Sequence, residues 1–315
     1  MTQTRPDGSL RHLLTLEGLQ KSQIEALLER AQKFVKPVGE PPVRKDSLAG
    51  ITVANLFTEP STRTRVSFEL AAKRLGADVV NLEVQLSSRV KGESMLDTIY
   101  TLEACQVDVF VIRDAELGVP GLVASHVKPH ASVLSAGEGS VSHPTQGLLD
   151  ALTILQSKER FDGLKVAIVG DVRHSRVARS AWHVLSTLGV GEIRIVAPKA
   201  LMPESSEFPG CERYASLDSG LAGVDVIMML RIQKERMATA QIPDADRYFT
   251  KYGLSAERLA KAHPEAIVMH PQPMNRGIEI SSEVADGPQS VIRDQVRNGV
   301  AVRMAVLEAV IEGRP

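Results

Sequence analysis

Short apolar runs, many of them rich in β-branched residues, recur along the chain and are separated by polar or amphipathic stretches. Runs of this length and composition are typical of strands that are covered on both faces of a parallel sheet. A first series of predicted strands comprises residues 51–57, 78–84, 107–113 and 131–135. A second series comprises residues 165–170, 193–197, 224–230 and 266–270. The chain is therefore expected to contain two sheets.

Amphipathic stretches with helical spacing alternate with these strands. Ser22 and Glu25 have the spacing of a capping box at the start of the first helix. The helix over 145–156 lies between the two strand series and is expected to bridge two domains. Strict alternation predicts an α/β fold with two domains, each a parallel sheet flanked by helices. The predicted helices are residues 22–34, 66–75, 95–105, 145–156, 176–188, 256–262 and 289–311.

The length of 315 residues agrees with about two domains. A net charge of −1 gives bulk electrostatics no reason to favour nucleic acid or a membrane surface. No apolar run approaches the ~18 residues that a spanning helix needs, and the polar N-terminus does not resemble a secretion signal. Cys105 and Cys211 match neither a disulfide framework nor a zinc site, and Cys105 is expected to be a buried thiol. We therefore expect a cytoplasmic, reduced protein.

A cluster of hydroxyl and guanidinium groups follows the first predicted strand and precedes a helix, and it reads Ser61-Thr62-Arg63-Thr64-Arg65. The first N–H groups of a helix lack internal partners and carry the positive end of the helix dipole. Together with these side chains they form a socket for a tetrahedral dianion such as phosphate. The alternative is a serine N-cap followed by two surface arginines in salt bridges, but interleaved arginines after a buried strand favour the anion site.

Arginines also lie at or just beyond the ends of three other predicted strands, namely Arg113, Arg176 and Arg231. Each one alone is more often a structural ion pair. Together with the socket they indicate substrates that carry several negative charges, because guanidinium groups bind carboxylate and phosphate in a bidentate manner. Nucleotide chemistry is not expected, because the strand over 165–170 is not followed by Gly-x-Gly-x-x-Gly and the chain contains no Gly-Lys-Ser/Thr phosphate loop.

Polar groups also flank the helix that begins near Pro144. The imidazole of His143 is placed to polarise a carbonyl, and Gln146 is placed to orient an amide. A histidine that caps its helix through the side chain is an equal alternative.

Two loop segments complete the candidate chemistry. After the last predicted strand, His270-Pro271-Gln272-Pro273 is rigid and leaves backbone carbonyls as acceptors. The segment from Ser87 to Glu93 presents a hydroxyl and the ammonium of Lys91 on a glycine-containing loop, which by itself is a weak signal.

The order and spacing of these motifs resemble the catalytic chains of the aspartate carbamoyltransferase family through nearly the whole length, from Arg11 to the C-terminal helix. Ser-Thr-Arg-Thr-Arg marks the wider carbamoyltransferase family, and Arg-x-Gln-x-Glu-Arg over 231–236 is typical of its aspartate branch. The other matching motifs are Lys91-Gly92-Glu93 and His143-Pro144-Thr145-Gln146.

The resemblance implies transfer of the carbamoyl group of carbamoyl phosphate to L-aspartate, giving N-carbamoyl-L-aspartate and phosphate in pyrimidine biosynthesis. It implies a carbamoyl-phosphate-binding domain over residues 1–144, completed by the C-terminal helix at about 298–315. An aspartate-binding domain would span 145–297, with the active site in the interdomain cleft.

Residue roles follow from the same resemblance. Phosphate would be held by Ser61, Thr62, Arg63, Thr64 and Arg113. Thr64, Arg113 and His143 would face the carbamoyl oxygen. Gln146 and the carbonyl of Pro271 would accept hydrogen bonds from the carbamoyl amide. Arg176, Arg231 and Gln233 would bind the aspartate carboxylates.

The resemblance also implies a homotrimer with shared active sites. Ser87 and Lys91 would reach into the site of a neighbouring subunit, and Lys91 would also contact aspartate. Glu59 would pair with Arg176 and Arg236 when the domains close. A regulatory or dihydroorotase-like chain is a further possible partner in this family.

The implied reaction needs a protein that stabilises an oxyanion and binds two substrates side by side, and it requires no metal or cofactor. The alternatives are an ornithine carbamoyltransferase, a catalytically inactive assembly subunit, and a phosphosugar or nucleotide binder. The ornithine enzymes generally carry Ser-Met-Gly and His-Cys-Leu-Pro, which this chain lacks. Gln272 and Met274 depart from the residues that other members carry, and they are expected to affect aspartate affinity rather than the reaction.

Overall fold

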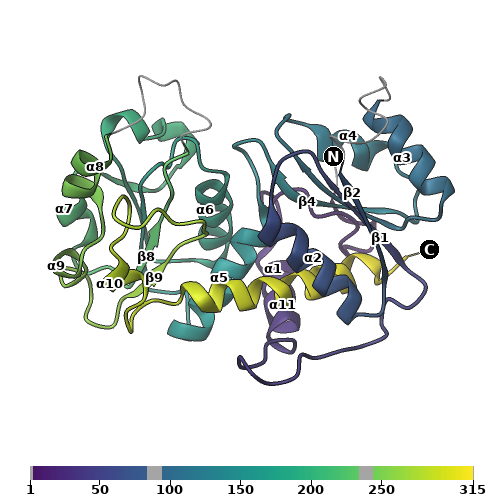
Figure 1. The fold of residues 1–315 in the computed structure, drawn as a ribbon, viewed down its shortest axis with the longest axis horizontal. Coiled ribbons are helices and arrows are strands. Elements are labelled where there is room, and N and C mark those ends of the chain that lie inside the picture. Colours follow the sequence, from purple (N-terminus) through teal and green to yellow (C-terminus); the bar gives the residue numbers. More distant parts are fainter. Residues whose placement is uncertain (1–2, 84–93, 234–243, 315) are drawn as a thin grey trace. The chain divides into compact units, whose positions relative to one another are not determined.

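The computed structural model describes residues 3–83, 94–233 and 244–314. The chain divides into two compact units, Met1–Leu149 together with Arg297–Pro315, and Asp150–Val296. Each unit contains one parallel sheet flanked by helices (Figure 1). The first boundary lies inside α5 (Pro144–Lys158) and the second inside α11 (Ile292–Ile311), so both chain connections between the units are helical.

The first unit is built on a four-stranded parallel sheet with the order β2-β1-β3-β4. The central strands β1 and β3 are buried along almost their whole length, which explains their apolar, β-branched composition. The strands are β1 (Thr52–Phe57), β2 (Asp78–Glu83), β3 (Val109–Asp114) and β4 (Ser132–Glu138).

Helices cover both faces of this sheet. Ile99 and Val123 pack with Phe110 and Ile112 in one buried cluster, so α3 and α4 cover one face. Figure 1 shows α2 and α11 on the other side of the strands. The helices are α1 (Lys21–Gln32), α2 (Thr62–Arg74), α3 (Met95–Ala104) and α4 (Val119–His126), in addition to α11.

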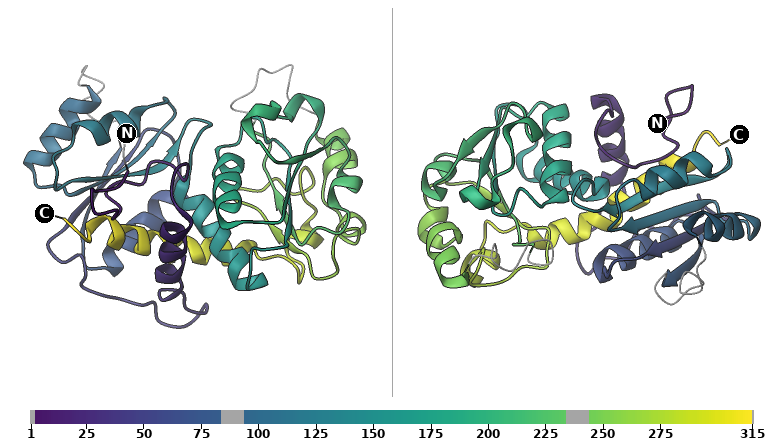
Figure 2. Two further views of the ribbon diagram at one scale, coloured as in Figure 1. Left: turned by 180° about the vertical axis from the view of Figure 1, so that it is seen from behind. Right: turned by 90° about the horizontal axis from the view of Figure 1, so that it is seen from above.

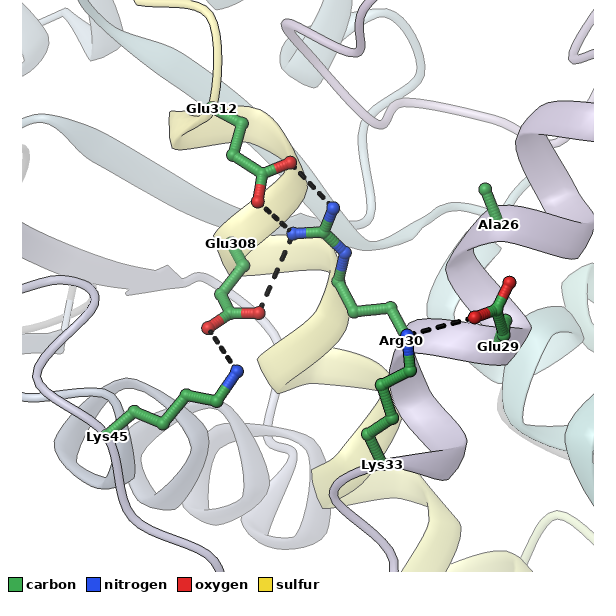
Figure 3. Close-up of a pocket in the computed structure, with 7 residues that line it drawn as sticks. All are labelled: Ala26, Glu29, Arg30, Lys33, Lys45, Glu308 and Glu312. Carbon is green, nitrogen blue, oxygen red and sulfur yellow. Dashed lines mark hydrogen bonds and ion pairs between the residues drawn. The ribbon is translucent and has the colours of Figure 1, made fainter.

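Charged side chains fasten α11 to α1 and to the segment before β1. The Arg30 guanidinium makes two bonds to the Glu312 carboxylate, and its Nη1 lies 3.6 Å from Oε2 of Glu308 (Figure 3). Oε1 of Glu308 lies 3.3 Å from Lys45 Nζ and accepts a 2.7 Å hydrogen bond from Ser47. We call this group of five residues the C-terminal clamp.

The second unit is built on a five-stranded parallel sheet with the order β7-β6-β5-β8-β9. The strands are β5 (Lys165–Val169), β6 (Glu192–Val196), β7 (Glu212–Tyr214), β8 (Val226–Met229) and β9 (Ile267–Met269). The helices are α6 (Arg176–Leu188), α7 (Leu217–Leu221), α8 (Ala245–Tyr252), α9 (Ala256–Leu259) and α10 (Ser282–Ala285). Figure 2 shows the two sheets and their helices from two further directions.

The predicted α/β fold with parallel sheets and flanking helices is confirmed. Two local expectations are wrong. The first helix begins at Lys21, and its N-terminus is fastened by the Gln20 N–H donating to Gln23 Oε1 at 3.0 Å rather than by Ser22 and Glu25. Cys105 is exposed, because α3 ends at Ala104 and the thiol falls in the turn after it. Within the described ranges, every helix is too short or too polar to cross a bilayer.

Candidate active site

The predicted socket and the candidate arginines Arg113, Arg176 and Arg231 lie where the sheets reverse their strand order. In the first sheet, β2 lies on one side of β1 and β3 on the other, so the order reverses between β1 and β3. In the second sheet it reverses between β5 and β8. Ligands of open α/β sheets bind outside the carboxyl ends of the strands at such switch points, because the connections diverge and leave a crevice.

The predicted phosphate socket lies at the switch point of the first sheet. Ser61 occupies the N-cap position of α2, yet its hydroxyl makes no capping hydrogen bond. The first turn contains no acidic residue and carries Arg63, with Arg65 immediately after. Helix N-termini normally favour acidic groups, so this charge is unfavourable for the helix alone and suits an anionic ligand. Thr64 is buried, whereas Arg63 is exposed.

Arg113 lies at the end of β3 beside the socket. Its backbone carbonyl accepts hydrogen bonds from the N–H and the hydroxyl of Thr58, which joins the carboxyl ends of β1 and β3. Its guanidinium donates to the Ala136 carbonyl at 3.3 Å. Nε of Arg113 also lies 3.3 Å from Oε2 of Glu59. Glu59 therefore contacts an arginine of its own unit, and its pairing with Arg176 stays a prediction.

His143 and Gln146 are the remaining candidate residues of the first unit. α5 begins at Pro144, as expected, so His143 immediately precedes the helix. The His143 carbonyl accepts the N–H of Gln146 at 3.0 Å, which keeps the two residues together. Both side chains are buried, and the first turn of α5 contains no acidic residue. This N-terminus, like that of α2, is suited to polar or anionic ligands.

In the second unit, the candidate residues include Arg176, Arg231 and Gln233. Arg176 is the first residue of α6, which follows β5, and only 5% of its surface is exposed. Arg231 and Gln233 follow β8, and Nη2 of Arg231 donates to Oε1 of Gln233 at 3.3 Å. Because β5 and β8 are neighbours, both arginines lie at the switch point of the second sheet.

Asp171 is a functional candidate that the sequence reasoning missed. Its buried carboxylate accepts the backbone N–H of Gln233 at 3.0 Å and lies 2.8 Å from Nδ1 of His174. It thereby fixes the segment after β8 against the segment after β5. Gly170 precedes it with φ of +119°, and a Cβ there would lie 2.8 Å from the Leu230 carbonyl. The sequence shows a carboxylate directly after a buried strand, but it does not show the contact with Gln233 that gives this carboxylate its role.

The last candidate in this unit is Pro271, which follows β9 and is half-buried. Gln272 beside it is also half-buried, and Met274 packs against the apolar core of the second unit. Ser87, Lys91 and Arg236 lie outside the described residues.

The described residues contain no group of three or more histidine, cysteine, aspartate or glutamate side chains that could hold a metal ion. They instead place arginines, hydroxyls and helix N-termini at two switch points. Fold and site together define a two-domain α/β protein with anion-binding chemistry in each domain.

Comparison with known families agrees with this class. The family model for the carbamoyl-phosphate-binding domain of aspartate/ornithine carbamoyltransferases matches residues 11–156. The model for their aspartate/ornithine-binding domain matches residues 162–310. The chain belongs to the aspartate/ornithine carbamoyltransferase family.

Solved structures of both branches of this family are similar to the chain. Aspartate transcarbamoylase from Trypanosoma cruzi in complex with carbamoyl phosphate is 31% identical, with a TM-score of 0.86 over 95% of each chain. The same enzyme in complex with N-(phosphonacetyl)-L-aspartic acid is 32% identical, with a TM-score of 0.85 over 95% of each chain. Ornithine carbamoyltransferase from Pyrococcus furiosus is 29% identical, with a TM-score of 0.82 over 96% of this chain and 97% of that one.

Proposed function

We propose that this protein transfers the carbamoyl group of carbamoyl phosphate to the amine of L-aspartate, giving N-carbamoyl-L-aspartate, a precursor of pyrimidines, and phosphate. The observation that carries the choice of aspartate is the pair of arginines at the second switch point, Arg176 after β5 and Arg231 after β8. Aspartate has two carboxylates, and two guanidinium forks match them. Ornithine has one carboxylate and a cationic side chain, which these arginines would repel.

The first half of the site would hold carbamoyl phosphate. The hydroxyls of Ser61, Thr62 and Thr64, the N-terminus of α2 and the guanidinium of Arg63 bind the phosphate. Arg113 contacts both the phosphate and the carbamoyl oxygen. Its present neighbours, Glu59 and the Ala136 carbonyl, hold its guanidinium at the carboxyl end of β3.

Two further groups would orient the carbamoyl carbon. The imidazole of His143 donates to the carbamoyl oxygen, and Gln146 accepts a hydrogen bond from the carbamoyl amide, as does the Pro271 carbonyl. The burial of His143 and Gln146 supports these roles, because hydrogen bonds are stronger away from water.

The chemistry then follows from position and charge. The uncharged amine of aspartate attacks the carbonyl carbon, and the carbonyl oxygen becomes an oxyanion in the tetrahedral intermediate. The C–O bond to phosphate breaks as the carbonyl reforms, and the departing phosphate takes a proton from the nitrogen. Each donor to the oxyanion contributes about 2.7–4 kcal/mol, and holding two substrates together contributes about 7–11 kcal/mol.

We also propose that the active unit is a homotrimer in which Ser87 and Lys91 complete the site of a neighbouring subunit. Lys91 would supply positive charge to both substrates. The motif Lys91-Gly92-Glu93 supports this role, because it occupies its family position between the socket and His143.

Support for the substrates also comes from the relatives. The Trypanosoma cruzi enzyme has been solved with carbamoyl phosphate and aspartate together, and with carbamoyl aspartate and phosphate. These structures are 32% identical to this chain over 95% of its length.

The test is a pair of assays on the purified protein with carbamoyl phosphate and either L-aspartate or L-ornithine. We expect N-carbamoyl-L-aspartate and phosphate in equal amounts, and no citrulline above background. Production of citrulline without carbamoyl aspartate would assign the chain to the ornithine branch. Absence of both products would favour an inactive assembly subunit.

A further inference from the structure

The segment after β9 is a tight turn with an uncommon backbone conformation. Gln272 has φ of 56°, in the left-handed region that side-chain-bearing residues seldom adopt. Such a conformation persists only where surrounding contacts hold it, and it occurs preferentially where a functional group must be placed. The turn contains Pro271, whose carbonyl oxygen is engaged in no backbone hydrogen bond among the described residues.

The imidazole of His270 holds this turn from inside. Its Nδ1 accepts the N–H of Gln272 at 2.9 Å, and its side chain is fully buried. Because Nδ1 accepts a hydrogen bond, the ring proton resides on Nε2. That nitrogen lies 3.2 Å from Oε1 of Glu279. The neutral ring therefore joins the turn on one side to a carboxylate on the other.

Glu279 fastens the exit of the same turn. Its side chain is fully buried, and Oε1 also accepts the backbone N–H of Asn275. The entrance is fastened separately, because the His270 N–H donates to Oε1 of Gln295 at 2.9 Å, and Gln295 in turn donates to Asp150 at 2.7 Å. A buried carboxylate is costly, so its placement against a surface turn is not explained by packing alone.

We propose that His270 and Glu279 are positioning residues that hold the Pro271 carbonyl oxygen as the acceptor for the carbamoyl amide. This inference rests on the proposed function and deepens it, because it assigns to this turn the recognition of carbamoyl phosphate over other acyl phosphates. A carbonyl oxygen accepts a hydrogen bond from an NH₂ group, whereas a methyl group has no hydrogen bond to donate. The imidazole and the carboxylate act through the backbone and do not contact the substrate.

Acetyl phosphate and inorganic phosphate are the probes for this role. Acetyl phosphate has a methyl group where carbamoyl phosphate has its amide nitrogen, and phosphate lacks the acyl group altogether. Loss of the acceptor should therefore weaken the binding of carbamoyl phosphate and leave the binding of the two probes unchanged. The measurements are KM for carbamoyl phosphate and the inhibition constants of acetyl phosphate and phosphate against it.

Two substitutions of Glu279 separate positioning from bulk stability. Glu279→Ala removes the acceptor for His270 and Asn275, and we expect KM for carbamoyl phosphate to rise about 10-fold while both inhibition constants stay within about twofold. Glu279→Gln keeps an acceptor oxygen in place and should restore KM to within about threefold of wild type.

Two substitutions of His270 separate its two hydrogen bonds. His270→Asn keeps an acceptor near the position of Nδ1, so the bond to Gln272 survives and the rise in KM should be partial. His270→Gln keeps a donor near the position of Nε2 and loses the bond to Gln272, so its KM should rise about as far as in Glu279→Ala. If Glu279→Ala does not fold, the two His270 variants still allow KM for carbamoyl phosphate to be compared with the inhibition constants of the two probes.

Gln289→Ala is the matched control. Gln289 donates to the carbonyl of Ala266 at 2.7 Å, and Ala266 directly precedes β9, whereas the turn held by His270 follows β9. It should change none of the three constants. If the Glu279 and His270 variants bind carbamoyl phosphate and acetyl phosphate more weakly by the same factor, or bind both as wild type does, the positioning role is overturned. A wild-type protein that forms no carbamoyl aspartate instead overturns the proposed function, and the two failures are therefore distinct.

Discussion

At the scale of single residues, the proposed reaction depends most sharply on the shape of a guanidinium group. Arg231 follows β8, and its Nη2 donates to Gln233, whose backbone is fixed by the buried carboxylate of Asp171. Arg231→Lys keeps the charge and loses the planar fork that binds a carboxylate with two parallel bonds. We expect kcat/KM for aspartate to fall about 100-fold, with KM for carbamoyl phosphate within about threefold, in steady-state assays.

Arg173→Lys is the control for that substitution. Arg173 lies in the same unit and pairs with Glu204 at 3.0 Å on the surface, with 41% of its side chain exposed. Its replacement should leave aspartate kinetics unchanged, since exposed pairs contribute little. Aspartate kinetics close to wild type in Arg231→Lys would contradict the assignment of this arginine.

His12 provides a prediction about pH and stability. Its side chain is buried, and Nδ1 accepts the N–H of Val133 at 3.0 Å. Burial, assisted by the positive charges of Arg11 and Arg5, lowers the pKa of His12 to about 4. The unfolded chain has the ordinary histidine pKa of about 6.5, so it takes up the proton first. The stability from neutral His12 is complete above about pH 6.5 and is lost as the pH falls towards 4, by about 3 kcal/mol.

His12→Asn tests this dependence, because the asparagine oxygen can accept the Val133 N–H without titrating. Denaturant unfolding at several pH values should show a flatter decline in free energy below about pH 6.5 than in wild type. The exposed His126 is the control, and His126→Asn should keep the wild-type slope. Identical slopes in wild type and His12→Asn would contradict the argument.

The residues of the candidate site were predictable to different degrees. Arg113, Arg176 and Arg231 could be found because each lies at or after the end of an apolar strand, and strand position is encoded locally. Asp171 and Glu279 could not, because their importance lies in contacts with segments such as Gln233, 62 residues away from Asp171 in the chain. A single buried carboxylate in a sequence looks like any surface aspartate or glutamate until its partners are known.

At the scale of elements, the strands of both sheet centres were predicted, and one edge strand of the second sheet, β7, was not. β8 is apolar along its length and β1 is mostly apolar, because both faces of these strands are covered. β7 has only the three residues Glu212–Tyr214 and is largely exposed, so it carries no apolar signal. The short helices α7 and α10 were missed because about one turn of helix shows no period, and the eight-residue helices α4 and α8 were missed as well.

The C-terminal clamp makes a prediction about element docking. Glu308 on α11 is only 8% exposed and faces Arg30, Lys45 and Ser47. Glu308→Gln keeps an acceptor for Ser47 and removes the charge that both cations face. We expect a loss of about 1–2 kcal/mol in the free energy of unfolding, measured with denaturant at low salt. The difference from wild type should shrink at high salt, because screening weakens the wild-type pairs.

Glu25→Gln is the control for the clamp. Glu25 lies 3.9 Å from Lys21 on the exposed surface of α1, with more than half of each side chain accessible. Its loss should change stability by less than about 0.5 kcal/mol. If Glu308→Gln is no more destabilising than Glu25→Gln, the clamp does not hold α11.

At the scale of the whole molecule, the two units share one plan. Each places its cationic groups where the strand order reverses, between β1 and β3 in the first sheet and between β5 and β8 in the second. The alternation of strands and helices predicted this plan, because parallel sheets direct all carboxyl ends to one edge. What alternation could not predict is the number of chains that build one site, since contacts between chains leave no period in a sequence.

Whether two chains build one site in the proposed trimer can be tested by mixing subunits that carry different substitutions. Arg63→Ala damages the socket, and Lys91→Ala removes the group that a neighbour is proposed to supply, so each pure trimer should be inactive. In a mixed trimer, one interface joins an intact socket to an intact Lys91. Random mixing in equal amounts makes about three quarters of trimers mixed, each with about one third of its sites intact, so about one quarter of wild-type activity should return. Mixing Arg63→Ala with Arg113→Ala should restore nothing, because both changes damage the same half-site. No recovery in the first mixture would place Lys91 in the site of its own chain.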